Sequence, residues 1–502
     1  MQSLVVAVIG IPFLGAVACL ALRDRASKYA ASVAALLTAG VAVVLTARLP
    51  SVTFLFGSMP WLGRGGEKGM FGYQFDPLTL IMLLASTVIG AGIVIYSIGY
   101  LRGENRDHPT TVGQARYYFW LMLFVGSMVG LSVSPSLLQL LIFWEMTTLC
   151  SWALISFYDT RESLRAGMKA LVMTSLGGLF FVGGVVWVFS ATGSFSFSAL
   201  GEMSPSLRAG VFALFLIAAW AKSAQAPFQT WLPDAMATPT PISAYLHAAA
   251  MVKAGVFLVA RLLLAGWSVP TGMSLLISIA ALVTMFGALV LYFFQDDLKR
   301  LLAYSTIAQL GFIFLGLGLG SLGATMAFKG AVLHILMHSV AKTLLFLTVG
   351  VIGYTCGTRS ISHLSGLART MPLAAVAFFV GAFALTGIPP LACFWSKMYI
   401  LIGALEVPGI FGPIALILVL TESLISFAWF LWVGQKVFFG KVKRIMPMKA
   451  ADGEEAEGER PLESAGRMHT PCSMNWILVI LIVACIVAPI VGIPLVQAIT
   501  LR

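Results

Sequence analysis

The sequence predicts an all-α integral membrane protein of about 14 transmembrane helices, with two inverted five-helix repeats that each contain a broken helix. Three observations lead to this prediction. Of the 502 residues, 59% are hydrophobic and only 10% are charged, whereas a soluble domain carries about 25% charged residues. Apolar runs of about 18 residues or more recur along the whole chain. Two of these runs, five spans apart, each combine a lysine with two prolines.

The bulk composition argues against several classes of protein. The formal net charge is +11, but the basic residues are scattered over short loops, which is the ordinary positive-inside bias and argues against nucleic-acid binding. The six cysteines are isolated and form no C-x-x-C pair, which argues against a disulfide framework or an iron–sulfur site. The first apolar run has no basic segment ahead of it and no A-x-A cleavage site, so we expect a span rather than a signal peptide.

The apolar runs place the spans along the chain, and two segments between them are not apolar. The glycine-rich segment 48–76 is expected to form an outer loop, and the acidic segment 445–473 a solvated cytoplasmic loop. The expected spans are 3–22, 29–47, 77–98, 116–133, 136–157, 168–191, 208–232, 241–265, 272–294, 300–320, 325–353, 373–396, 413–436 and 474–496.

Basic residues set the expected orientation, because they concentrate in the odd-numbered loops. This bias places the N-terminus outside, and an even number of spans returns the C-terminus to the same side. We therefore expect a multi-pass protein of the inner (cytoplasmic) cell membrane. The expected divisions are 1–115 for the N-terminal helices and outer loop, 116–265 for the first repeat, 272–436 for the second repeat, 437–473 for the charged cytoplasmic loop and 474–502 for the last helix.

Two interrupted helices are the features around which the sequence is organised. Lys222 precedes two prolines in the seventh span, and Lys397 follows two prolines at the end of the twelfth. A charge near the bilayer centre costs at least about 2.5–3.5 kcal/mol, and proline ends or kinks a helix. Because the two spans are five apart, the second copy must be inverted, as in transporters whose half-helix ends line a site at mid-membrane. The expected helix breaks are at Pro227, Pro233, Pro389 and Pro390.

Glu145 is a carboxylate in the middle of the fifth span, with apolar residues on both sides. An unpaired carboxylate there would be protonated or would seek a cation, and Lys222 is the candidate partner. Separating such a pair would let the lysine discharge, so the pair would serve as a proton switch. The alternative is a static ion pair that fixes the helix register.

His247 and Lys253 lie six residues apart in the eighth span. On a helix this separation gives about two turns and roughly 9 Å of rise, so a water relay connects the two groups better than direct contact does. The alternative for His247 is a hydrogen-bonded packing residue. The nearby lysines favour the functional interpretation.

The eleventh span carries a polar stripe, because His334, His338 and Lys342 recur every four residues. Two histidines at this spacing can bind zinc, but neither a glutamate in the H-E-x-x-H arrangement nor a nearby cysteine completes a site. No metal is therefore expected. A hydrated proton wire is favoured, since neutral histidine accepts a proton on one nitrogen and donates from the other.

Lys397 lies near the outer end of its apolar run. It is either an anchor whose ammonium reaches the membrane interface or, given its place in the repeat, an exit-side residue of the pathway. Glu422 is a further buried carboxylate for which the sequence assigns no partner.

Together these residues form a recognisable pattern. It resembles the antiporter-like membrane subunits of respiratory complex I, a family shared with Mrp-type sodium/proton antiporters and membrane-bound energy-converting hydrogenases. The resemblance covers at least residues 140 to 400. The segments that carry it are 222–227, 229–236, 239–244 with His247, 297–306, and 334–338 followed by Lys342.

The resemblance implies a fourteen-helix core with two inverted five-helix repeats. It implies that Glu145 and Lys222 are the coupled pair, that His247 and Lys253 form a central relay, and that Lys397 is the exit lysine. It assigns the link to the second half to His334, His338 and Lys342. The chain looks most like the core of the distal complex I subunit and of the large Mrp subunit. Both usually carry extensions beyond that core, whereas this sequence stops soon after the fourteenth span.

The sequence therefore predicts a proton- or sodium-translocating subunit of a multisubunit membrane complex, most like a redox-driven complex I or hydrogenase assembly. No redox centre or other cofactor is expected in this chain, so the energy comes from partner membrane subunits. One alternative is a subunit of an Mrp-type sodium/proton antiporter. Another is a self-sufficient secondary transporter of an organic solute, and a third is a scaffold bundle without ion transport. Expected partners are other membrane subunits, the lipid bilayer, and protons or sodium ions.

Overall fold

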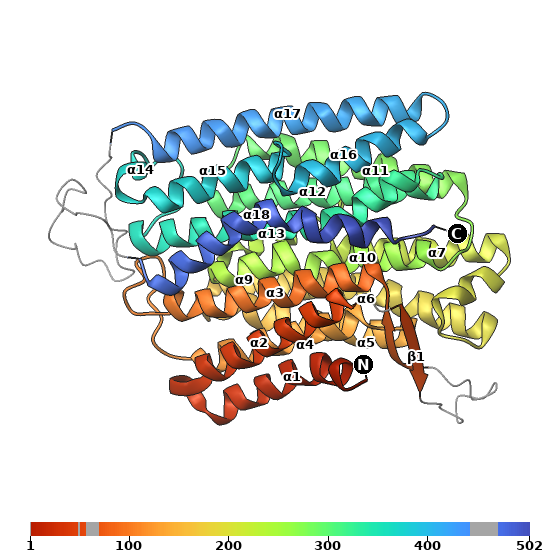
Figure 1. Cartoon of the computed structure of the whole chain (residues 1–502), viewed down its shortest axis with the longest axis horizontal. Coiled ribbons are helices and arrows are strands. Elements are labelled where there is room, and N and C mark those ends of the chain that lie inside the picture. The colour runs from red at the N-terminus through yellow and green to blue at the C-terminus, as the bar shows by residue number, and fades with distance from the viewer. Residues whose placement is uncertain (1, 49–50, 57–69, 442–469, 502) are drawn as a thin grey trace.

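The computed structural model describes residues 2–48, 51–56, 70–441 and 470–501. Within these residues the protein is a bundle of long helices that run side by side, with one small sheet near one end (Figure 1). The predicted all-α membrane fold is confirmed. The acidic loop expected at 445–473 falls almost wholly outside the described residues.

The N-terminal part contains three long helices and a hairpin. Strand β1 (Val52–Phe56) pairs antiparallel with β2 (Phe71–Phe75), so the expected outer loop is partly ordered as a sheet. Asp76 then caps the next helix, since its Oδ1 accepts the Thr79 amide at 2.8 Å and proline follows at the first helical position. The helices are α1 (Gln2–Ala21), α2 (Arg23–Ala47) and α3 (Pro77–Tyr100).

The middle of the chain forms two successive groups of helices. The first contains α4 (Gln114–Ser132), α5 (Leu137–Ile155), α6 (Arg161–Thr192), η2 (Phe197–Glu202), α7 (Pro205–Lys222), α8 (Trp231–Asp234), η3 (Ala235–Ala237), α9 (Thr240–Ala244), the π-helical turn η4 (Tyr245–Ala249) and α10 (Met251–Leu264). The second contains α11 (Thr271–Tyr292), α12 (Leu298–Ser321), α13 (Thr325–Cys356), α14 (Leu367–Thr370), α15 (Pro372–Thr386), α16 (Ala392–Glu406) and α17 (Phe411–Phe438). The last helix is α18 (Cys472–Gln497).

The described residues contain 12 helical segments long and apolar enough to cross a membrane. The chain is thus a multi-pass membrane protein. Helix α4 and the interrupted pair α15 and α16 bring the spans to the fourteen that the sequence predicts. Both chain ends lie at the end of the bundle that carries the hairpin (Figure 1), as an even number of spans requires.

Three expected spans differ from the observed helices. The seventh, predicted over 208–232, ends as a long helix at Lys222. The eighth, predicted as continuous over 241–265, is interrupted by the π-helical turn before α10. The twelfth, predicted over 373–396, is split into α15 and α16, so its second half extends ten residues beyond the predicted end.

The two predicted proline breaks have a common cause. A proline ring cannot donate a backbone hydrogen bond and collides with the carbonyl four residues earlier. Pro227 therefore stops α7 near Ser223, and Pro390 stops α15 at Thr386, where the two helices do end. The break in the eighth span has no proline at the interruption.

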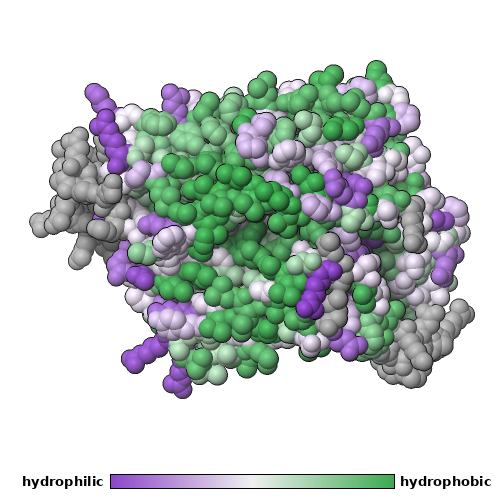
Figure 2. All heavy atoms as spheres, in the orientation of Figure 1, coloured by the Kyte–Doolittle hydropathy of each residue, from purple (hydrophilic) through white to green (hydrophobic). Residues whose placement is uncertain are grey.

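The core of the bundle lies around α13, which is buried along nearly its whole length, together with α10, α12 and α3. Large exposed apolar side chains instead gather on peripheral helices such as α1, α6, α17 and α18. Figure 2 shows apolar side chains over the middle of one face and hydrophilic ones mainly toward its two ends. An outward apolar band with polar ends is the surface expected of a bundle solvated by lipid.

Helix α16 packs against the start of α13 at almost backbone contact, because Gly403 has no side chain. A Cβ built on Gly403 would lie 2.1 Å from the Ala327 nitrogen, whereas one on Gly287 of α11 would meet nothing within 4 Å. We expect Gly403→Ala to destabilise the purified protein by at least about 1–3 kcal/mol. The control, Gly287→Ala, should be neutral or slightly stabilising. Thermal unfolding in detergent measures both, and equal midpoints would contradict the packing.

Candidate functional site: a buried row of lysines and histidines

Lys222 is the last residue of α7, and the helix break holds it in place. The carbonyl of Ser223, which Pro227 leaves without its helical donor, accepts the Gln225 side-chain amide at 3.1 Å. The Ser223 hydroxyl donates to the Val252 carbonyl at 2.7 Å, and this bond ties the break to α10. The peptide groups freed by the break thus find protein partners, as a membrane interior requires.

The Lys222 ammonium is fully buried and bonds to α5. Its Nζ donates to the Trp144 carbonyl at 2.9 Å and to the Thr148 hydroxyl at 2.6 Å, and it lies 5.1 Å from the centre of the Trp144 ring. Two oxygen acceptors and the face of an aromatic ring therefore stabilise the ammonium in place of a carboxylate.

Glu145 is adjacent to these acceptors, but it forms no direct ion pair with Lys222. The two groups interact electrostatically across a longer separation. Glu145 is half-buried, and its Oε1 has no hydrogen-bond partner within the described part of the chain. It lies against Gly178 of α6, where a Cβ would come within 2.1 Å of Oε1. Lys222 is therefore close to Glu145, but the two side chains do not form the direct ion pair that the sequence suggested.

His247 lies in the π-helical turn η4, between the two halves of the eighth span. It is fully buried and stacks on Phe346 of α13, with ring centroids 5.5 Å apart. Neither ring nitrogen has a hydrogen-bond partner among the described residues, so His247 is not the hydrogen-bonded packing residue of the alternative interpretation. The Ala248 carbonyl, one residue on, accepts the Ser339 hydroxyl of α13 at 2.6 Å.

Lys253 connects the two halves of the molecule directly. Its Nζ lies 2.9 Å from Nδ1 of His338, a residue of α13 that is 85 positions later in the chain. Both side chains are fully buried, and His338 Nε2 has no partner among the residues described. The ammonium donates to Nδ1 of a neutral imidazole, so Nε2 carries the ring proton and can donate it to a water.

His334 continues the row one turn away. The rings of His334 and His338 lie 5.9 Å apart, close enough for a bridging water. His334 Nε2 is 3.1 Å from the Gln309 side-chain oxygen, and its Nδ1 is 2.8 Å from the Ser396 hydroxyl. Because Gln309 Oε1 only accepts, Nε2 carries the proton. Nδ1 is then an acceptor for the Ser396 hydroxyl, whose other acceptor is the Cys393 carbonyl at 3.1 Å.

Lys397 lies beside Ser396 in the first half of α16, deep in the bundle, and its side chain is only 4% exposed. Lys397 is thus not placed as an interfacial anchor, because it is buried near the break between α15 and α16 and not at an end of the interrupted span. Its Nζ donates to the Thr386 carbonyl at 3.2 Å, the group that Pro390 leaves without a helical donor. The lysine also lies 4.4 Å from the centre of the Phe312 ring.

Glu422, for which the sequence suggested no partner, lies next to the end of this row. Lys397 Nζ donates to the neighbouring Ser423 hydroxyl at 3.0 Å and interacts electrostatically with Glu422. The Glu422 carboxylate also accepts from Ser426 at 2.7 Å. Lys342 branches from the row, because its ammonium donates to the Ser305 hydroxyl of α12.

The comparisons with known proteins identify the family and support the fold. A family model described as "NADH:quinone oxidoreductase/Mrp antiporter, TM" matches residues 134–426, more than half of the chain. The chain belongs to this family. A second model, described as the N-terminus of chain 5 of NADH-ubiquinone oxidoreductase (complex I), matches residues 61–118. The resemblance inferred from the sequence is thus confirmed.

Curated relatives of this family member include chloroplast proteins named NAD(P)H-quinone oxidoreductase subunit 5. The chain is 39% identical to that of Anthoceros angustus over 393 residues, which is 74% of this chain and 51% of the relative. It is also 39% identical to that of Chaetosphaeridium globosum over 400 residues, 76% of this chain and 57% of the relative. The chain therefore spans about half the length of these relatives.

Two solved structures share the fold. A chain in the structure of the Mrp complex from Dietzia sp. DQ12-45-1b superposes with a TM-score of 0.83 and 30% identity, covering 98% of this chain and 51% of that one. A chain of the membrane-bound sulfane sulfur reductase, an archaeal respiratory membrane complex, gives a TM-score of 0.80 over 99% of this chain and 97% of that one. Its identity of 23% supports the fold alone.

The structure adds side chains to the site that the sequence analysis did not single out. Thr148 and Ser396 bind a lysine and a histidine, Gln309 orients His334, and Gly178 leaves room for Glu145. Gln309 carries a usable signal, since it is an uncharged amide inside the apolar run of α12. The hydroxyls and the glycine carry none, because such residues occur throughout membrane helices.

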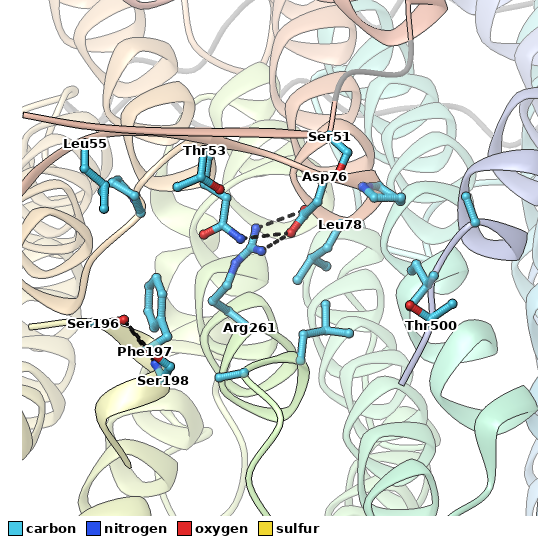
Figure 3. Close-up of a pocket in the computed structure, with 17 residues that line it drawn as sticks. Ser51, Thr53, Leu55, Asp76, Leu78, Ser196, Phe197, Ser198, Arg261 and Thr500 are labelled. Carbon is cyan, nitrogen blue, oxygen red and sulfur yellow. Dashed lines mark hydrogen bonds and ion pairs between the residues drawn. The ribbon is translucent and has the colours of Figure 1, made fainter. Parts of the chain in front are cut away.

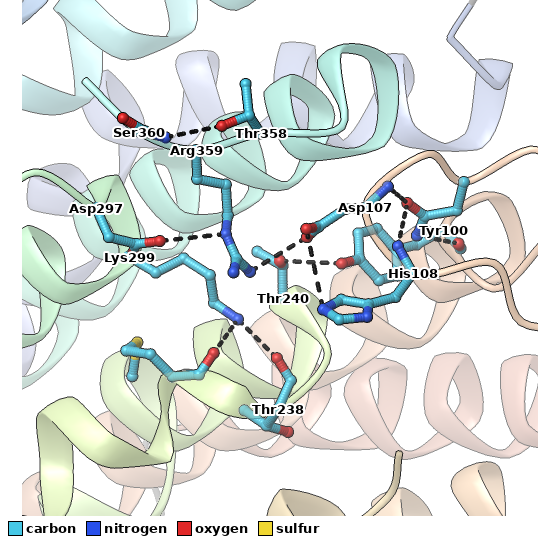
Figure 4. A network of polar contacts seen from close by, with 12 residues as sticks. Tyr100, Asp107, His108, Thr238, Thr240, Asp297, Lys299, Thr358, Arg359 and Ser360 are labelled. Carbon is cyan, nitrogen blue, oxygen red and sulfur yellow. Dashed lines mark hydrogen bonds and ion pairs between the residues drawn. The ribbon is translucent and has the colours of Figure 1, made fainter. Parts of the chain in front are cut away.

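A second polar network closes the bundle at the end opposite the hairpin (Figure 4). Lys299 donates to two backbone carbonyls just before α9, at 2.8 and 2.6 Å. Arg359 bridges Asp107 and Asp297 at 3.1 and 3.4 Å. Burial lowers the pKa of the neighbouring His108 below its usual value, although Asp107 opposes this shift. The network joins the α3–α4 loop to the ends of α12 and α13.

Removing the Thr148 hydroxyl tests how far the buried Lys222 ammonium, and with it the stability of the protein, depends on this acceptor. Thr148→Val keeps the shape and removes one acceptor from a buried ammonium, so we expect a loss of about 1.5–3 kcal/mol in unfolding free energy. The control is Thr147→Val, whose hydroxyl donates only to its own helix, at 2.6 Å. The thermal midpoint in detergent should fall clearly more for Thr148→Val. Equal midpoints would show that the contact between Thr148 and Lys222 does not contribute to stability.

Proposed function

We propose that the chain is a proton- or sodium-translocating subunit of a multisubunit membrane complex. The observation that carries the proposal is the buried row of titratable groups. Lys253 is in direct contact with His338, and His334 bonds to Ser396, the residue before Lys397 in α16. Buried charges in a membrane are costly, so their accumulation along one line between two broken helices points to an ion pathway. The scaffold alternative offers no reason for such a row.

Proton movement along the row follows from the donor and acceptor roles of its members. Transfer from Lys253 Nζ to His338 Nδ1 converts an ammonium to an amine and an imidazole to an imidazolium. The imidazolium can then release its other proton, from Nε2, to a water between the two histidine rings. His334 and the Ser396 hydroxyl extend this path to the neighbourhood of Lys397 and Glu422.

Lys222 and Glu145 are proposed as the switch at the start of this row. In the observed arrangement the ammonium rests on Trp144 and Thr148, and the Glu145 carboxylate lies free of it. Movement of the ammonium onto the carboxylate would stabilise both charges, and withdrawal would favour discharge of the lysine. The switch therefore has two distinct positions that a neighbouring event can bias.

The driving energy is proposed to come from partner membrane subunits in a redox-driven complex. Support comes from relatives named as subunits of an NAD(P)H-quinone oxidoreductase. A second candidate is an Mrp-type sodium/proton antiporter, supported by a likeness at 30% identity that covers 98% of this chain. Isolating the native complex and identifying its other subunits distinguishes the two. Dependence of transport on sodium concentration identifies the ion.

The orientation and the internal division are part of the proposal. We place the chain in the inner (cytoplasmic) membrane with both termini outside, because the basic loops lie at the end away from the two termini. Residues 116–265 and 272–436 are proposed as two inverted repeats. The similar breaks after Lys222 and before Lys397 support this division.

Substitution of the switch tests the function. In the intact assembled complex, we expect Lys222→Ala and Glu145→Ala to lower ion transport by about tenfold or more, since a barrier increase of about 1.4 kcal/mol suffices. Lys329→Ala is the matched control, because that lysine lies outside the row and donates to the Gln497 carbonyl. Transport into vesicles measures the effect. Unchanged transport in both switch variants would favour the scaffold alternative.

The position of Glu145 provides a milder test. Gly178→Ala adds a methyl group where Glu145 Oε1 now lies, while Gly183→Ala on the same helix meets its nearest atom only at 3.9 Å. We expect the first variant to assemble normally and to transport several-fold more slowly, because the carboxylate is displaced from its place near Lys222. The second should match the parent. Equal rates in the two variants would show that the exact position of the carboxylate is unimportant.

A further inference from the structure

A polar cavity of about 400 Å³ opens at the hairpin end of the bundle (Figure 3). Ser51, just before β1, and Thr53 and Leu55 of β1 line one side. Ser196 and Ser198 of the segment at the start of η2 line another, and Thr500 from the end of the chain closes a third. Hydroxyl groups from three parts of the chain, interspersed with apolar side chains, thus line a space large enough for several waters.

An ion pair forms the floor of the cavity, and it lies outside the buried row of lysines and histidines. Arg261, near the end of α10, donates to both Asp76 oxygens and to the Thr79 hydroxyl. Its side chain is 2% exposed, and its Nε has no hydrogen-bond partner within the described residues. Burial opposes ionisation of Asp76, yet Arg261 and Thr79 hold its pKa below the usual value. Asp76 is therefore an anion that lines the cavity.

Arg261 shares its helix with the central lysine of the row. Lys253, Phe257 and Arg261 follow one another at four-residue spacing along α10, so about 12 Å of helix rise separates the lysine from the arginine. Phe257 is fully buried between them, and the Arg261 guanidinium lies 5.2 Å from the centre of its ring. One aromatic residue therefore separates the central relay from the floor of the cavity along this helix.

We propose that this cavity is the outer aqueous outlet of the first repeat, with the Arg261–Asp76 pair as its inner boundary and Phe257 as the dry barrier between that boundary and Lys253. The inference rests on the proposed function and extends it to the side of the membrane opposite the basic loops. The species that occupies the cavity is water that carries hydronium. When the Phe257 ring turns aside, water joins the Lys253 ammonium to Asp76. The proton then leaves Nζ through this water for the outer solution, as an alternative to its transfer to His338 Nδ1.

The charges at the floor suit this role. A carboxylate held ionised by a permanent cation accepts a proton briefly and releases it readily to bulk water. The guanidinium keeps its charge at any working pH, so Asp76 returns to its ionised form after each transfer. The pair thus passes protons on without retaining them.

Site-directed cysteine modification in the intact complex tests the outlet. Ser198→Cys places a nearly isosteric thiol in the cavity, and Cys472→Ser first removes the exposed native cysteine. A membrane-impermeant, positively charged methanethiosulfonate reagent is then added from the outer side. We expect it to label Cys at 198 and to lower transport roughly tenfold, because a fixed cation near the path raises the energy of a passing proton. The matched control is Val52→Cys, since Val52 is exposed on the other face of β1 and should label without effect.

Three outcomes overturn the outlet. These are no labelling from the outer side, labelling only from the opposite side, and labelling that leaves transport unchanged. If Ser198→Cys prevents assembly, Thr53→Cys on the facing strand gives the same readout. The transport rate of the unmodified complex separates the two proposals. If transport depends on Lys222 but is unaffected by the reagent, the outlet alone is contradicted. If transport does not depend on Lys222, the proposed function is contradicted.

Discussion

A helix that stops inside a membrane must find protein partners for the peptide groups that it leaves open, and this requirement shapes the whole bundle. At the end of α7 the Gln225 amide takes the freed Ser223 carbonyl, and the Ser223 hydroxyl ties the break to α10. At the end of α15 the freed Thr386 carbonyl is taken by Lys397 itself. The hydrogen bonds that satisfy the freed carbonyls therefore also help to position the two lysines. Each break thus serves both the fold and the proposed ion pathway.

The site is possible because α13 is covered on all sides. A helix with a lipid-facing side carries few polar groups there, whereas α13 is buried along nearly its whole length. Steps of four residues turn about 40° around a helix, so His334, His338 and Lys342 face successively different neighbours. His334 contacts α12 and α16, His338 contacts α10, and Lys342 contacts α12 again. One helix thereby links both halves of the molecule.

Local chemistry in the sequence explains which features were predictable. The spans follow from apolar run length, and the breaks after Lys222 and before Lys397 follow from proline sterics. The interruption at His247 was not predictable, because its sequence is helix-compatible and a hydroxyl from α13 bonds to the carbonyl of the following residue. Lys397 lies deeper than the sequence predicts. The apolar run 373–396 predicts a span that ends just before this lysine, whereas the prolines lie between α15 and α16, in the middle of the interrupted span. The contact of Lys397 with Thr386 depends on how the two half-helices meet.

The last helix has a consequence for how the protein is made. Helix α18 packs against α3, α13 and α15, with Gly99 of α3 meeting residues at its start and Gly492 meeting α13 side chains near its end. The spans before α18 are synthesised first, so the faces of α3, α13 and α15 that it covers stay open until α18 is made. We therefore expect these helices to reach their final packing only after α18 has been inserted beside them.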